Sequence, residues 1–264
     1  MERRPRMTSS SLDTELINDL PPQLANNRAY WLGWGSDDDV LSDLPIYRSG
    51  LPQGMLNGVL RARDVNIDTA IQRARAALDG TSWLWWYNPA DSDPGVADEL
   101  LERGAVEVGT VPIMAARLRG KPVVPLPQGV RIEQARTASA LKAFASIYPV
   151  PNGMTTADVD ATTAVELARN GRHELQLRYV AWLGDVPVSC GALSISNGVA
   201  GIYNMATVAE YERRGIAAAL AAELLAEAHE QGIPVVTLTA SPRGARIYQR
   251  LGFQNVSEYR LFKL

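Results

Sequence analysis

The alternation of apolar and polar positions predicts a strand, a turn and a helix within the C-terminal half of the chain. The segment 199–208 is rich in strand-forming residues and follows Asn197-Gly198, a pair typical of hairpin turns. Apolar residues then recur every fourth position from Ile216 to Leu224, which indicates the buried face of a helix. Gly232 marks the end of that helix. The order strand, turn, helix is therefore expected here.

The rest of the C-terminal half extends this alternation. The run 235–239 predicts a strand, and a helix that ends at Gly252 follows it before a final strand. Upstream, the patterns predict a strand at 130–133, helices at 137–148 and 157–169, and a hairpin of 174–183 and 187–195. Thr155 or Thr156 would cap the second helix, and Asn170-Gly171 would close it. These elements predict an α/β protein with a mixed central sheet flanked by helices.

The turn within 211–220 has the composition of a phosphate-binding turn. Gly215 can adopt backbone angles that a side chain would obstruct, and the small residues 217–219 let a ligand approach the main chain. The N–H groups and the dipole at the start of the helix favour an anion, and Arg213 and Arg214 add full charges. A phosphorylated cofactor is the predicted ligand. The simpler alternative is a solvated corner that happens to carry two arginines.

Two motifs give the C-terminal half a resemblance to a known family. The pattern Gln/Arg-x-x-Gly-x-Gly/Ala falls on residues 212–217, which match it at every position but the first, and residues 248–253 read Tyr-x-x-Leu-Gly-Phe. With both motifs in this order, the last hundred or so residues resemble the acyltransferases of the GNAT superfamily. Glu212 departs from the pattern, which has Gln or Arg at this position. An ionised glutamate cannot donate a hydrogen bond to a pyrophosphate, as Gln or Arg could.

The resemblance implies an acyl-CoA-dependent N-acyltransferase, with acetyl-CoA or another acyl-CoA as co-substrate. The acyl group would pass directly to the amine of a small molecule. Tyr248 would give a proton to the leaving thiolate, and Tyr203 and Asn204 are the strongly polar side chains on the strand before the loop. The residues that the resemblance places at the cofactor are Met205, Ala206, Thr207, Val208, Arg213, Arg214, Gly215, Ile216, Ala217, Ala218, Ser241 and Ala245.

The general base and the acceptor pocket are less defined. The segment 200–208 contains no carboxylate, so a water relay, or an amine that is partly neutral, would replace a dedicated base. By resemblance, the first helices of the half frame the acceptor, and ordinary core packing is the alternative for their side chains. The candidates there are Phe144, Tyr148, Asn152 and Met154.

The N-terminal half repeats the order of elements seen at the C-terminus. A strand at 83–87, a helix that ends before Gly104 and a strand region at 106–118 match the succession from 235 to 264. Aligning Gly104 with Gly252 places Leu100 where the other half has Tyr248. Tandem halves occur in the family that the chain resembles, so the resemblance implies tandem GNAT-like domains, and a chance likeness between common α/β units is the alternative. The predicted division is a degenerate domain at 1–120, a proline-rich linker at 121–129 and a catalytic domain at 130–264.

Composition restricts the classes of partner. The 264 residues are 46% hydrophobic, yet no apolar run is long enough to span a bilayer, so no membrane contact is expected. Cys190 is the single cysteine, which fits a reducing cytoplasm and excludes an internal disulfide. His173 and His229 lie apart from acidic clusters, so no metal is predicted. The net charge of −3 speaks against extensive contact with nucleic acid.

Three other functions stay open. The donor could be an acyl carrier protein or an aminoacyl-tRNA in place of acyl-CoA, or the chain could be a non-catalytic module that binds acyl-CoA. Arg243, Arg246 and Arg250 share one helix face, which is either a solvated surface or a contact for phosphates or an acyl carrier.

Overall fold

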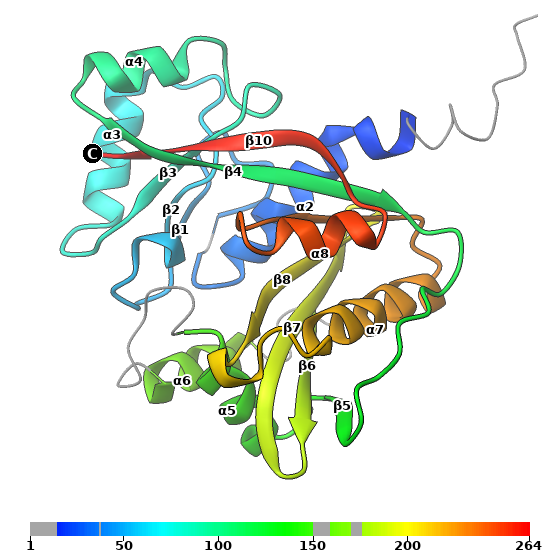
Figure 1. Cartoon of the computed structure of the whole chain (residues 1–264). Coiled ribbons are helices and arrows are strands. Elements are labelled where there is room, and N and C mark those ends of the chain that lie inside the picture. The colour runs from blue at the N-terminus through cyan, green and yellow to red at the C-terminus, as the bar shows by residue number, and fades with distance from the viewer. Residues whose placement is uncertain (1–14, 37, 150–158, 170–175) are drawn as a thin grey trace, which may run out of the picture.

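A mixed ten-stranded sheet runs through the protein, and helices cover both of its faces (Figure 1). The structure, a computed structural model, describes residues 15–36, 38–149, 159–169 and 176–264. The strand order is β1-β2-β3-β10-β4-β9-β8-β7-β6-β5. The strands are β1 Ile46–Arg48, β2 Asn57–Val59, β3 Leu84–Tyr87, β4 Val106–Arg117, β5 Val130–Gln134, β6 Gln176–Leu183, β7 Val186–Ser196, β8 Val199–Thr207, β9 Val235–Thr239 and β10 Gln254–Lys263.

The helices of the C-terminal half lie where the sequence patterns predict them. They are α5 Ala138–Ile147, α6 Val159–Arg169, α7 Ile216–Glu230 and α8 Ala245–Arg250. The helices of the N-terminal half are α2 Leu20–Leu32, α3 Ile67–Ala77 and α4 Val96–Glu102. Asn152, Met154, Thr155, Thr156, Asn170, Gly171 and His173 lie outside the described residues. The α/β fold class is confirmed, with the mixed sheet at its centre.

The two halves exchange their last strands. β4 of the N-terminal half lies between β9 and β10, and β10 of the C-terminal half lies between β3 and β4. The order β2-α3-β3-α4-β4 therefore corresponds to β8-α7-β9-α8-β10, and both units contain one parallel pair, β2 with β3 and β8 with β9. The last strand of each unit therefore pairs with strands of the other unit, and a continuous sheet runs through both halves.

The pairing of β4 with β10 is symmetric about one residue pair. Val111 lies opposite Tyr259, and these positions are 148 apart, the same spacing as Gly104 and Gly252 (252 minus 104). Shifting by 148 also turns the pair Val106 with Lys263 into the pair Ala115 with Gln254, both of which are observed. Each strand leaves one residue unpaired, at Val108 and at Val256, again at matching positions. This approximate two-fold register supports the predicted duplication.

The helices form separate cores on the two faces of the sheet. α7 and α8 pack on Leu193, Ile202 and Leu238, whereas α2 and α5 pack on the opposite side around Val180 and Tyr203. The sequence analysis did not predict α2, which crosses from the N-terminal half onto β7 and β8. Among the described helices, none has the length and apolar character needed to traverse a lipid bilayer.

Candidate functional site

The start of α7 lies directly behind a glycine turn. Gly215 stands at the N-cap position with φ 81°, and Arg213 before it has φ 62°, so the chain turns through the left-handed region twice. No side chain caps the helix, because glycine has none to offer. The first N–H groups of a helix lack intrahelical acceptors. The N–H groups of Ile216, Ala217 and Ala218 therefore have no acceptor within the helix, since the first intrahelical bond is that of Ala219 to Gly215.

The corresponding helix of the N-terminal half has its first turn capped. The side chain of Asn66 accepts hydrogen bonds from the N–H groups of Asp68 and Thr69, at 3.1 and 3.2 Å. The carboxylate of Asp68 adds a negative charge at the same end of α3 and pairs with Arg103. A phosphate at the start of α3 would compete with the Asn66 side chain for these N–H groups, and the Asp68 carboxylate would repel it. The first turn of α3 is thus capped by a side chain, whereas the first turn of α7 is not.

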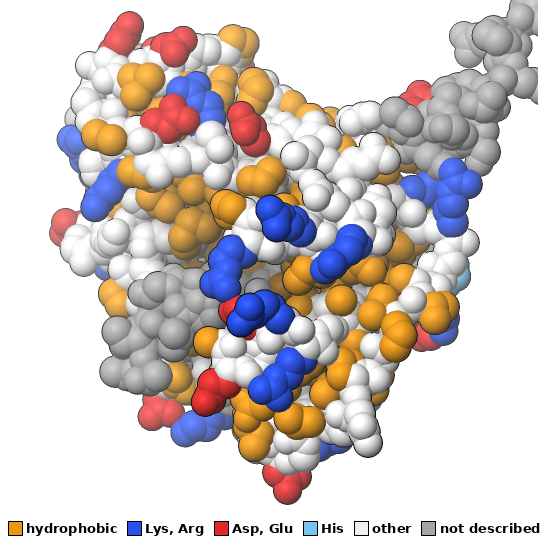
Figure 2. All heavy atoms as spheres, viewed as in Figure 1, with side chains coloured by type: hydrophobic (Ala, Val, Ile, Leu, Met, Phe, Trp, Pro, Cys, Tyr) orange, Lys and Arg blue, Asp and Glu red, His pale blue; other side chains and the backbone are white. Residues whose placement is uncertain are grey.

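Basic side chains surround the start of α7. Figure 2 shows Lys and Arg gathered in the middle of the face where Figure 1 places α8 and the start of α7. Arg214 donates to the carbonyl oxygen of Glu210 at 2.9 Å and lies over the ring of Tyr211. Arg243, in the turn before α8, donates to Glu212 at 2.7 Å. Arg213 is exposed and has no ion pair among the described residues.

β8 and β9 part next to this helix start. Their parallel pairing covers Ala200 to Ile202 and then stops, so the last residues of β8 have no partner on the β9 side. A β-bulge bends β8 at the same place, because Asn204 and Met205 together oppose Gly191 of β7. Asn204 takes φ 50°, and its side-chain Nδ2 is buried with no hydrogen-bond partner in the described structure.

Some backbone groups of β8 beside the gap between β8 and β9 already have hydrogen-bond partners. The N–H of Val208 donates to Val188 and the carbonyl of Ala206 accepts from Ser189 Oγ, so these two groups are already used. The hydroxyl of Thr207 also lies within 2.8 Å of Ser189 Oγ. Of the predicted segment 205–208, the backbone edge that faces β9 is what remains for a ligand.

Tyr248 lies on the α7 side of the sheet with its ring almost fully buried. Its ring packs against Phe253, with 5.6 Å between the centroids. Burial raises the pKa of the phenol well above its usual range, so the hydroxyl stays protonated at neutral pH. Among the described residues this hydroxyl has no hydrogen-bond partner. It is an available proton donor on the helix that follows β9.

Tyr203 lies on the opposite side of the sheet from Tyr248. Its hydroxyl donates to Asn26 of α2 at 2.7 Å, and its ring stacks on Tyr30 at 3.6 Å. The structure therefore does not bring the predicted catalytic tyrosines together. Phe144 and Tyr148 are fully buried beside this cluster, where Tyr148 donates to Glu166 at 3.0 Å.

The remaining predicted cofactor residues lie at the start of α8. Ser241 accepts a hydrogen bond from the N–H of Gly244 at 3.1 Å, and its carbonyl accepts from Ala245 at 3.0 Å. Both residues therefore shape the turn that presents Arg243. Among the described residues, no three His, Cys, Asp or Glu side chains gather as a metal ion would require.

The polar side chains that α2 places beside the gap were not predicted from the sequence. Gln23 accepts from Thr237 at 3.0 Å, and Asn27 and Tyr259 line a small cavity of about 10 Å³ beside the gap in the sheet. Asn27 Oδ1 and the Tyr259 hydroxyl are buried there with no partner in the described chain. Polar residues inside an otherwise apolar helical segment, Gln23 and Asn26-Asn27, are the signal that could have indicated it.

Residues 151–263 match the acetyltransferase (GNAT) domain family. The resemblance to the GNAT superfamily is thereby confirmed for these residues. That fold supports acyl transfer in general.

Solved structures share the fold across both halves. A GCN5-related N-acetyltransferase from Kribbella flavida is 19% identical, with a TM-score of 0.69, and the match covers 92% of this chain and 94% of that one. A GCN5-related N-acetyltransferase from Sphaerobacter thermophilus is 18% identical, with a TM-score of 0.60 and coverage of 84% and 75%. A tandem GNAT protein from the clavulanic acid biosynthesis pathway is 15% identical, with a TM-score of 0.58 and coverage of 84% and 78%. A search of curated protein sequences found no match.

Proposed function

We propose that this protein transfers an acyl group from acyl-CoA, with acetyl-CoA the simplest donor, to the amine of a small molecule. The observation that carries the proposal is the uncapped start of α7 behind Gly215, directly beside the gap between β8 and β9. An anion-binding helix end suits the pyrophosphate, and a free strand edge suits the amide groups of pantetheine. The basic side chains Arg213, Arg214 and Arg243 favour the same anion.

The chemistry requires a proton donor near the sulfur. The neutral amine attacks the thioester carbonyl carbon, the carbon–sulfur bond breaks, and the thiolate takes the proton of the Tyr248 hydroxyl. The nitrogen then releases a proton to water, and Tyr248 recovers one from solvent, which leaves an amide and the CoA thiol. Asn204 offers an unpartnered N–H beside the gap, where it would stabilise the oxyanion. We assign Tyr203 a positioning role, since Asn26 and Tyr30 hold it.

The proposal predicts one cofactor site per chain, because the start of α3 carries its own cap. Titration calorimetry with CoA tests this directly, and a stoichiometry near one is the expected result. Turnover is then measured with acetyl-CoA and a panel of small amines for the full-length protein. Binding without turnover for any amine would indicate a binding module. Absence of CoA binding would favour an acyl carrier protein or aminoacyl-tRNA as donor.

A further inference from the structure

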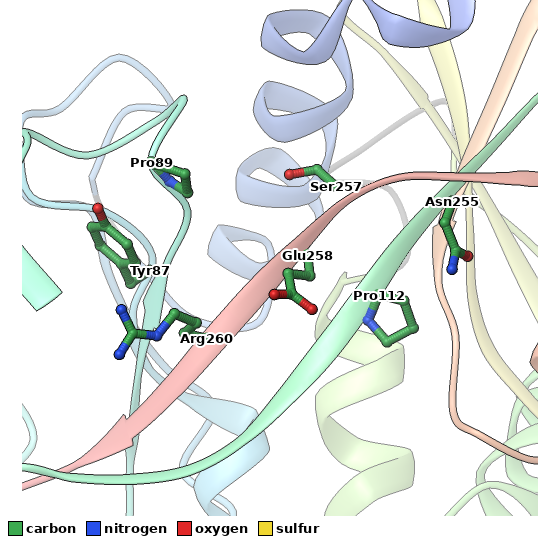
Figure 3. Close-up of a pocket in the computed structure, with 7 residues that line it drawn as sticks. All are labelled: Tyr87, Pro89, Pro112, Asn255, Ser257, Glu258 and Arg260. Atoms are coloured by element: carbon green, nitrogen blue, oxygen red, sulfur yellow. The ribbon is translucent and has the colours of Figure 1, made fainter.

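A pocket of about 560 Å³ opens where the exchanged strands β4 and β10 meet the end of β3 (Figure 3). Tyr87 and Pro89 from the end of β3 form one wall, and Pro112 of β4 forms another. The side chains of Asn255 and Glu258 project into the opening from β10. This volume suits a small organic molecule, and the apolar walls with a few polar groups have the usual character of a ligand site.

The two charged side chains that line this pocket differ, because one has an ion-pair partner and the other has none. Arg260 binds Glu107 in a two-point contact, with distances of 2.7 and 3.2 Å, and this partner raises the pKa of the guanidinium. The charge of Arg260 is therefore balanced. Glu258 is exposed and has no ion pair among the described residues. Glu258 is therefore the one unbalanced charge among the side chains that line the pocket, and a cationic ligand is favoured.

The pocket adjoins the strand that borders the proposed thioester position. The carbonyl oxygen of Pro112 accepts a hydrogen bond of 3.0 Å from the N–H of Ala240, the residue directly after β9. From Ala240 the chain enters the turn that carries Arg243 and leads to Tyr248. A basic surface for the CoA phosphates and an acidic pocket for the acceptor would thus share the end of β9.

We propose that this pocket binds the acceptor and that the acceptor carries a second basic nitrogen. The inference rests on the proposed acyl transfer. An amine that attacks a thioester must be neutral, whereas an ammonium group held by the Glu258 carboxylate keeps its proton. Glu258 therefore binds a nitrogen that does not react. The acceptor class is a diamine or longer polyamine whose carbon chain lies against Tyr87, Pro89 and Pro112.

Calorimetric titration of the full-length protein with 1,5-diaminopentane tests the pocket without any acyl donor. Glu258→Gln should weaken binding about tenfold at low salt, because it removes the charge and keeps the shape. Glu223→Gln is the matched control, since this exposed glutamate of α7 does not line the pocket and its loss changes the net charge equally. Asn255→Asp should tighten binding by a similar factor. Equal weakening in Glu258→Gln and Glu223→Gln, or no gain from Asn255→Asp, would overturn the proposal.

Kinetics separate this inference from the proposed function. Glu258→Gln should raise KM for the diamine with little change in kcat and none in the dissociation constant of CoA, and pentylamine should show no such change. If the wild type acylates the diamine and KM is unaltered in Glu258→Gln, the pocket inference fails and acyl transfer stands. If the wild type does not bind CoA, acyl-CoA as the donor fails, and the titration with 1,5-diaminopentane then tests the pocket by itself. Equal thermal midpoints of the variants exclude misfolding.

Discussion

Nη2 of Arg243 lies 2.7 Å from Oε2 of Glu212, so the turn before α8 is tied to the turn before α7. Glu212 stands where the family pattern has a donor, Gln or Arg, and here it holds a donor from another element instead. Arg243 remains 83% exposed in this contact. Exposed ion pairs contribute only about 0.2–1 kcal/mol, so the fold does not depend on it.

Glu212→Gln is therefore expected to bind CoA about threefold to tenfold more tightly. The amide can donate to a phosphate, and a negative charge leaves the anion site, while the lost pair with Arg243 costs less than this gain. Titration with CoA measures the effect. Glu210→Gln is the control, because it removes an exposed charge two residues earlier without altering the motif. Tightening of equal size in both variants would show a general charge effect, and weaker binding in Glu212→Gln would show that the anchored Arg243 dominates.

Gly215→Ala should weaken CoA binding about tenfold while the protein stays folded. A side chain at φ 81° is strained by roughly 1–2 kcal/mol, and relief of that strain turns the first N–H groups of α7 away from the ligand. An added Cβ would cause no steric clash, since its nearest atom is Pro127 Cγ at 3.8 Å. Gly198→Ala provides the comparison, because Gly198 has φ 78° in the β7–β8 turn. It should lose similar stability and keep its CoA affinity.

The local pattern of the sequence was sufficient to predict the motif-bearing elements. The strand before the loop, the helix after it and the helix that carries Tyr248 are found as β8, α7 and α8. Their signals lie within short windows, where period and turn residues decide the structure. The assignment of Tyr248, Asn204 and the loop residues to acyl transfer stays a prediction.

Two features could not be derived from such windows. The exchange of β4 and β10 pairs residues more than a hundred positions apart, so no short window of sequence contains both partners. α2 buries Gln23, Asn26 and Asn27, which an isolated helix would expose. Asn26 is hydrogen-bonded to β7 and β8, and Gln23 to β9, so only the tertiary structure accounts for these two buried side chains.

Tyr248→Phe should lower kcat by about 10²- to 10⁴-fold and leave CoA affinity unchanged, as expected for loss of a general acid. Because burial raises the phenol pKa, Tyr248 should not limit activity as the pH rises from about 8 to 10. Steady-state rates and CoA titrations across that range test both statements. Tyr179→Phe removes a hydroxyl bonded to Glu227 and should retain its kcat. An unchanged kcat in Tyr248→Phe would exclude the proton-donor role.

Stability should fall steeply above about pH 10. Burial raises the pKa of several phenols in the folded protein, and their stabilising effect is complete below the unfolded value and is lost as the pH rises towards the folded one. The tyrosines concerned are Tyr30, Tyr47, Tyr148, Tyr179, Tyr203, Tyr248 and Tyr259. Urea denaturation at about pH 8 and pH 10.5 measures the free energy of unfolding on either side of the unfolded pKa.

Tyr259→Phe refines this prediction. Its hydroxyl is buried with no partner in the described chain, so removing it should not destabilise the protein near pH 8 and should reduce the loss at high pH. Tyr179→Phe breaks the bond to Glu227 and should cost about 1 kcal/mol near pH 8. If Tyr259→Phe were the more destabilising of the two, an unseen partner such as ordered water would have to hold that hydroxyl.

Neither predicted domain should fold alone when the chain is divided at the proline-rich linker. A fragment of residues 121–264 lacks β4, so β9 and β10 lose the strand that lies between them and expose unpaired edges. It also loses α2, which leaves the face of Tyr203 uncovered. Expressed separately, the fragments 1–120 and 121–264 should aggregate, whereas co-expression should give a soluble one-to-one complex that binds CoA. Gel filtration measures whether each fragment aggregates, and circular dichroism measures whether it is folded. A folded, CoA-binding fragment of residues 121–264 would show that the exchange of strands is dispensable for the C-terminal domain.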